Sequence, residues 1–240
     1  MSFFITTFKK VFKNELVVDS FKYLVVDFFS RVFKFLFIPA FAYLLPLNIY
    51  GKFSLDLSFI IFLSLSISLN TPNFFRHLTL KFFDKINRYW SSLFLILFFL
   101  GSIHLLVVLL FGINEKWYYL IGISVSYCIA NAYNFYLLGL NKKLKYLVEM
   151  TIVNTLLYFS VFLYFLIVKN FTVINELDIY IFHLCSGVVT SVYILFKIIK
   201  KHKIYFFGII TELKHLLQKN IPLIFHALSG LSLIYIDRIF

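Results

Sequence analysis

Apolar runs of about 20 residues recur along the whole chain, and each is long enough to cross a bilayer as a helix. Hydrocarbon offers the backbone no hydrogen-bond partners, so a run that crosses it must satisfy its own backbone groups, as a helix does. We therefore predict an all-α, polytopic membrane helix bundle of six transmembrane helices and the start of a seventh. The predicted spans are Tyr23–Leu45, Phe53–Leu69, Tyr89–Gly112, Trp117–Leu140, Leu147–Val168, Ile179–Ile199 and a last one from Ile221.

The composition agrees with a membrane protein and not with a soluble domain. Hydrophobic residues make up 61% of the chain and charged residues 14%, whereas soluble domains average about 45–50% and about 25%. The net charge of +12 would suggest a nucleic-acid partner in a soluble protein. Here its distribution along the chain argues against one, and we expect no nucleic-acid binding.

Lysine and arginine gather on one side of the predicted topology. Of the 23 basic residues, 17 fall in the N-terminal segment and in the loops after the second, fourth and sixth spans. The opposite loops hold Lys52, Lys116 and Lys169. Because loops rich in lysine and arginine stay in the cytoplasm, we predict a cytoplasmic N-terminus in the bacterial inner (plasma) membrane.

This topology divides the chain into four predicted segments. Residues 1–22 form a basic, amphipathic segment at the cytoplasmic interface, and residues 23–199 form the six-helix lobe. Residues 200–220 form a basic and partly amphipathic cytoplasmic linker. Residues 221–240 open a seventh helix that the end of the sequence interrupts, which suggests a truncated form of a longer transporter.

Charged residues inside the spans are the strongest functional signal. Asp27, Arg31 and Lys34 share one stripe of the first helix, and Asp237 and Arg238 stand in the seventh. A charge in mid-bilayer costs roughly 2.5–3.5 kcal/mol on insertion scales, so charges kept there usually face an interior or an aqueous cavity. Lys34 lies ~18 Å beyond Lys22 on a helix, too deep to reach the headgroups easily. The alternative, side chains extending to the membrane surface, suits Asp27 better.

Milder polar stripes follow the fourth and fifth spans. Tyr127, Asn131 and Asn134 fall on one face of the fourth, and Asn154 lies on a similar face of the fifth. Two interpretations stay open. Either these side chains form hydrogen bonds between helices, or they line a solvated path that suits sugar hydroxyls.

The sequence contains no motif that indicates catalysis. Cys128 and Cys185 both lie within spans, and the histidines show no metal-ligand spacing. The chain contains no nucleophile elbow, no phosphate-binding glycine loop and no clustered carboxylates. We predict neither an enzyme nor a cofactor or metal site.

Two stretches together resemble the bacterial polysaccharide flippases, the O-antigen and capsule translocases of the multidrug/oligosaccharidyl-lipid/polysaccharide exporter superfamily. One is "FLFIPAFAYLLPLNIYGKFSLDLSFIIFLSLSISLNTPNFFRH", residues 35–77, which resembles the first two helices of that family. The other is "LLQKNIPLIFHALSGLSLIYIDRIF", residues 216–240, which resembles its seventh helix. "YLLGLNKKLKYLVEMTIVNTLL", residues 136–157, is more weakly similar to the junction of the fourth and fifth helices.

The resemblance implies a two-lobed transporter that flips polyprenyl-pyrophosphate-linked oligosaccharide across the inner membrane by alternating access, for O-antigen or capsular polysaccharide. It implies that Arg31, Lys34 and Arg238 contact the pyrophosphate, that Asp27 and Asp237 support them or accept a coupling H+ or Na+, and that the tyrosine and asparagines above face the sugars. Alternatives are a cation-coupled multidrug exporter of the same fold, an inactive membrane fragment and, less favoured, a polyprenyl-phosphate glycosyl- or acyltransferase.

Overall fold

The protein is described by a computed structural model over residues 24–25, 28, 43, 47–140, 148–157, 176–205 and 209–220. Throughout this part the regular structure is helical and includes no strand, as predicted from the apolar runs. Most of the first and fifth predicted spans and the whole of the seventh lie outside the described residues.

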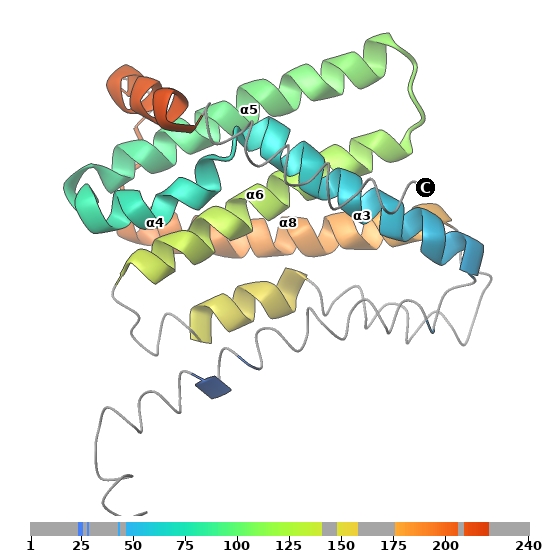
Figure 1. Ribbon diagram of the computed structural model, residues 1–240, viewed down its shortest axis with the longest axis horizontal. Helices are drawn as coiled ribbons and strands as arrows, with labels where there is room; N and C mark the ends of the chain where they lie inside the picture. Colours follow the sequence, from blue (N-terminus) through green and yellow to red (C-terminus); the bar gives the residue numbers. More distant parts are fainter. Residues whose placement is uncertain are drawn as a thin grey trace, which may run out of the picture.

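Figure 1 shows long helices that run back and forth past one another. Helix α3 spans Leu47–Ser68, α4 spans Thr71–Lys81, and a 3-10 turn over Phe83–Lys85 leads into α5, Ile86–Leu110. Helix α6 spans Lys116–Gly139 and α8 spans Glu176–Lys201. Between and after them lie a helix over Val148–Leu157 and one over residues 210–220.

Three helical segments of the described part are long and apolar enough to cross a membrane: Leu47–Ser68, Phe83–Leu110 and Leu177–Lys201. Large apolar side chains such as Phe98, Leu109, Val192 and Phe196 are exposed on α5 and α8, as expected of surfaces that face lipid. These helices identify a membrane protein. They match the second, third and sixth predicted spans. The fourth, Trp117–Leu140, is described as helix α6 but is not among these three, and the count of six stays a prediction.

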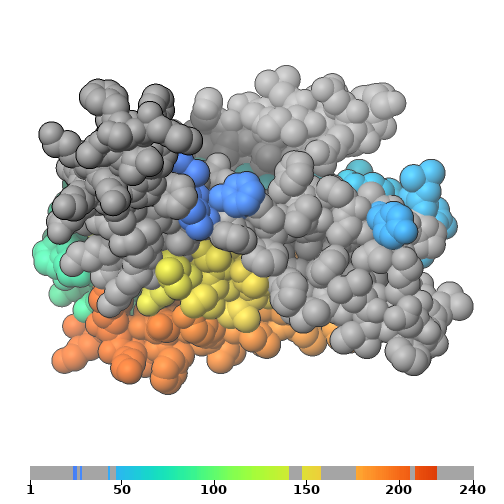
Figure 2. Space-filling view, turned by 90° about the horizontal axis from the view of Figure 1, so that it is seen from below, coloured from blue at the N-terminus to red at the C-terminus, as the bar shows by residue number. Residues whose placement is uncertain are grey.

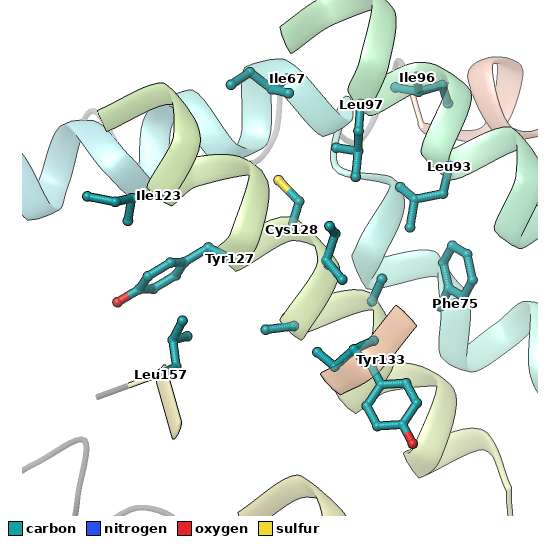
Figure 3. Packing of buried hydrophobic residues seen from close by; sticks show 14 of the residues in the cluster. Ile67, Phe75, Leu93, Ile96, Leu97, Ile123, Tyr127, Cys128, Tyr133 and Leu157 are labelled. Atoms are coloured by element: carbon teal, nitrogen blue, oxygen red, sulfur yellow. The ribbon is translucent and has the colours of Figure 1, made fainter. Parts of the chain in front are cut away.

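Helix α6 is the most central of the described helices, because it packs against α3, α4, α5 and α8. It is as long as a membrane span and carries Ser124, Ser126, Asn131 and Asn134 among its apolar residues. Figure 3 shows Cys128 and Tyr127 leaving α6 on different sides. The Cys128 thiol donates to the carbonyl of Ser64 on α3 at 3.1 Å, so α6 satisfies polar groups of its neighbours.

Small residues let α6 and α8 approach closely. A Cβ placed on Gly187 of α8 would lie 2.8 Å from the Cβ of Ser126 on α6, and one on Gly122 would lie 2.6 Å from a methyl of Leu184. Gly122 and Ser126 are four residues apart and therefore share a face of α6. In membranes, small residues at this spacing favour close helix packing by dispersion, since burial from lipid supplies no hydrophobic driving force.

Helix α4 corrects the sequence prediction, which treated residues 70–88 as a loop. The chain turns at Leu69 and Asn70, whose φ angles of 50° and 57° are left-handed, and Pro72 then stands in the first turn of α4. At its other end, α4 lies against the last residue of α6. A Cβ on Gly139 would lie 2.5 Å from the Cβ of Thr79 and 3.1 Å from the carbonyl oxygen of Arg76.

The two ends of this lobe differ in charge. We call the basic end the one formed by α4, the start of α5, the ends of α6 and α8, and helix 210–220, and the other the opposite end. Helix 210–220 is held to the start of α5, because Arg88 donates to Glu212 at 3.3 Å and the Tyr89 hydroxyl lies 3.1 Å from His215 Nδ1. Figure 2 shows helix Val148–Leu157 lying alongside α8.

Candidate functional site

The five charged residues predicted to bind pyrophosphate or support its binding, Asp27, Arg31, Lys34, Asp237 and Arg238, lie outside the described residues. Their roles stay predictions. The four predicted sugar-facing residues, Tyr127, Asn131, Asn134 and Asn154, are described, and three of them bond between helices.

Tyr127 is buried, and its hydroxyl is hydrogen-bonded to Nε2 of His183 on α8 at 3.2 Å. Asn134 donates from Nδ2 to Oδ1 of Asn154, in helix Val148–Leu157, at 3.1 Å. These contacts match the interpretation of the polar stripes as hydrogen bonds between helices. Asn131 is exposed.

A buried ion pair at the opposite end was missed from the sequence. Asp56 of α3 is 2% exposed, and Lys116 Nζ lies 3.3 and 3.4 Å from its two carboxylate oxygens. Tyr180 of α8 donates its hydroxyl to the same carboxylate. Three helices thus meet at one negative charge. The signal was present, since Asp56 is an acidic residue inside the predicted span Phe53–Leu69, but its partners are 60 and 124 residues away.

The chemistry of this cluster follows from its burial. Removing a carboxylate from water is costly, and the cost is offset only by an opposite charge and by hydrogen bonds to its oxygens. The ammonium of Lys116 supplies the charge and Tyr180 supplies a hydroxyl donor. The aromatic ring of Phe53 lies 6.5 Å from the rings of both Tyr180 and His183, so it contacts both this cluster and the Tyr127–His183 pair.

A cavity of about 190 Å³ lies at the basic end. Its walls come from α6, helix Val148–Leu157, α8 and the residue that follows α8. The lining residues are Tyr133, Tyr136, Leu137, Glu149, Lys197, Ile198, Lys201 and His202.

Two hydrogen-bonded chains build the polar walls of this cavity. In the first, Glu149 accepts from the Tyr133 hydroxyl at 2.8 Å and from Lys197 at 3.5 Å. In the second, His202 Nδ1 donates to Asn87 Oδ1 at 2.6 Å, so that a neutral His202 accepts the Tyr136 hydroxyl on Nε2 at 2.8 Å.

His202 is uncharged at neutral pH. Its burial lowers the pKa from 6.5 to about 4, and the nearby positive charge of Lys201 acts in the same direction. The ammonium of Lys201 lies 5.3 Å from the centre of the Tyr136 ring. The charges on the cavity wall are therefore two lysines and one glutamate.

Neither cluster is a metal site. Among the described residues, no group of three or more histidine, cysteine, aspartate or glutamate side chains could hold a metal ion. No family model, curated protein or solved structure matches the chain. The function must therefore be argued from the physical features of the molecule and from its sequence.

Proposed function

We propose that the chain belongs to a transporter that flips polyprenyl-pyrophosphate-linked oligosaccharide across the bacterial inner membrane for O-antigen or capsule synthesis. The observation that carries the proposal is that charged and amide side chains persist inside apolar helices. The described lobe pairs several of them internally, as with Asp56 and the amide nitrogen of Asn134. In this proposal the cations of the first and seventh helices meet an anionic cargo.

The chemistry of that cargo fits those cations. A pyrophosphate is a compact polyanion, and a guanidinium binds phosphate oxygens through two parallel hydrogen bonds. In this proposal Arg31, Lys34 and Arg238 bind the pyrophosphate, while Asp27 and Asp237 hold the arginines in place or accept a coupling cation. Asn131, exposed on α6, offers its amide to sugar hydroxyls.

A genetic test separates transport from folding. Cells in which the gene for this chain is replaced by an Arg31→Ala, Lys34→Ala variant should lose surface polysaccharide, while the protein stays in the membrane at normal abundance. The matched control, Lys9→Ala with Lys10→Ala, removes the same charge from the N-terminal segment and should leave export intact. Normal polysaccharide export by the span variant would contradict the cargo assignment.

Asp56 favours a second candidate, the cation-coupled multidrug exporter. Such exporters bind cationic compounds and need buried carboxylates, and Asp56 is a buried carboxylate. Its charge is compensated by Lys116, which weakens the case. The two candidates differ in phenotype. Tolerance to cationic dyes that is lost in Asp56→Asn, with surface polysaccharide unchanged when the gene is deleted, would support the exporter over the flippase.

A further inference from the structure

The cavity at the basic end has the size of a small anionic headgroup. Its volume of about 190 Å³ is roughly six times the ~30 Å³ that a water molecule occupies in the liquid. Pockets that enclose drug-sized ligands measure about 300–1,000 Å³. The cavity can therefore receive a phosphate group with part of its ester, and it is too small for an oligosaccharide.

The cavity also lies at the end of an apolar helix, where lipid phosphates are expected. Lys197 and Lys201 belong to the last two turns of α8, at the end of the apolar segment Leu177–Lys201. A helix that leaves the hydrocarbon there places its final turn among the headgroups. Basic pockets between membrane helices on the cytoplasmic side are a known arrangement for anionic headgroups.

Charge on the cavity wall favours an anion. The two lysines outweigh Glu149, whose carboxylate already accepts from Tyr133 and Lys197. The end of α8 carries partial negative charge, which Lys200 and Lys201 in its last turn offset. The Tyr136 ring beneath the Lys201 ammonium restricts where that charge can lie, at 5.3 Å from the ring centre.

We infer that this cavity binds the phosphate group of an anionic membrane lipid, with Lys201 and Lys197 as its charged contacts. The inference does not rest on the proposed flippase function. Two lipids share the chemistry, a bilayer phospholipid and a polyprenyl pyrophosphate, and they are distinguished by testing each one. None of its lining residues is among Arg31, Lys34 and Arg238, the residues proposed to bind the transported pyrophosphate.

The test measures lipid binding to the purified full-length chain in a neutral detergent by native mass spectrometry. Phosphatidylglycerol and polyprenyl pyrophosphate are titrated separately, with zwitterionic phosphatidylcholine as the neutral reference. We expect phosphatidylglycerol to bind in preference to phosphatidylcholine. Lys201→Gln should weaken that binding by about tenfold, which corresponds to the loss of one charge-assisted hydrogen bond.

Two further variants make the result specific. Lys200→Gln changes the same charge one residue away and outside the cavity lining, so in about 0.15 M salt it should weaken binding by about twofold or less. Glu149→Gln removes the negative charge while keeping an oxygen for Tyr133, so it should tighten binding by about threefold. If the cavity bound no lipid, Lys201→Gln and Glu149→Gln would not change lipid affinity in opposite directions.

Three outcomes would overturn the inference. The first is equal binding of phosphatidylglycerol and phosphatidylcholine. The second is equal losses in Lys200→Gln and Lys201→Gln, which would indicate attraction to the surface as a whole. The third is binding of millimolar inorganic phosphate, lost in Lys201→Gln, with no lipid bound at all, which would identify a soluble phosphate in place of a lipid. Preference for polyprenyl pyrophosphate over phosphatidylglycerol, lost in Lys201→Gln, supports a phosphate site and assigns its source.

Discussion

The buried ion pair at the opposite end leads to a prediction about unequal partners. The side chain of Asp56 is 3% exposed and that of Lys116 is 28% exposed. If Lys116 is replaced by methionine, Asp56 stays buried and still accepts a hydrogen bond from the Tyr180 hydroxyl. Breaking a buried pair in this way costs about 3–5 kcal/mol, and Tyr180 places the expected loss of unfolding free energy near the lower limit, about 3 kcal/mol.

The reverse substitution should cost less. In Asp56→Asn the amide oxygen still accepts from Tyr180, and the partly exposed Lys116 can turn its ammonium toward water. We expect a loss of about 1 kcal/mol, typical of one hydrogen bond. The double variant should lose about 1–2 kcal/mol, because neither charge is then left alone, and so the two substitutions should couple by about 2 kcal/mol or more.

The assay is unfolding of the four proteins in one detergent, with Lys200→Met as a control for loss of an exposed lysine. That control should stay within about 0.5 kcal/mol of the wild type. Equal losses for Lys116→Met and Asp56→Asn, adding to within about 0.5 kcal/mol in the double variant, would refute the argument, since independent sites behave in that way.

Three other predictions concern packing, pH and export. Gly139→Ala should lower the unfolding free energy by about 1–3 kcal/mol, because its Cβ would meet the backbone of α4 at Arg76, whereas Gly101→Ala, with 3.7 Å of room, should be neutral or stabilising. Because the pKa of His202 is lowered to about 4, the unfolded chain binds the extra proton first, so stability should fall as the pH drops from 6.5 towards 4. The resulting loss of unfolding free energy is about 2 kcal/mol at pH 5. It should be absent in His202→Gln, as measured by thermal unfolding at a series of pH values. Arg31→Ala alone should reduce surface polysaccharide, scored by gel, without reducing the protein in membrane fractions.

Hydropathy predicted the long helices well and did not predict the short helix α4. The predicted spans Tyr89–Gly112, Trp117–Leu140 and Ile179–Ile199 agree with α5, α6 and α8 to within three residues at each end. Helix α3 begins earlier than predicted, because Asn48 and Lys52 are polar but helical. Helix α4 was not predicted because its sequence, "TPNFFRHLTLK", is too polar for a span. Its stability comes from the packing of Phe75 and Leu78 against neighbouring residues.

The polar site residues were harder to predict, because periodicity identifies a face and does not identify what covers it. Tyr127 and Asn134 share a stripe with Asn131, yet the first two bond to other helices and the third is exposed. The Asp56 cluster depends on contacts between segments far apart in the sequence. The sequence of one span shows Asp56 as an unexpected charge, and only the packing of the helices shows which residues pair with it.

These contacts separate two kinds of polar residue in the lobe. Asp56, Tyr127 and Asn134 each bond to a neighbouring helix, and a hydrogen bond between membrane helices is worth roughly 0.6–2 kcal/mol. Their loss should therefore act first on stability, whatever the cargo. A residue that contacts cargo should instead change transport while the unfolding free energy stays the same. Measuring both quantities for each variant is thus what decides whether a polar residue in this lobe holds the helices together or serves passage through them.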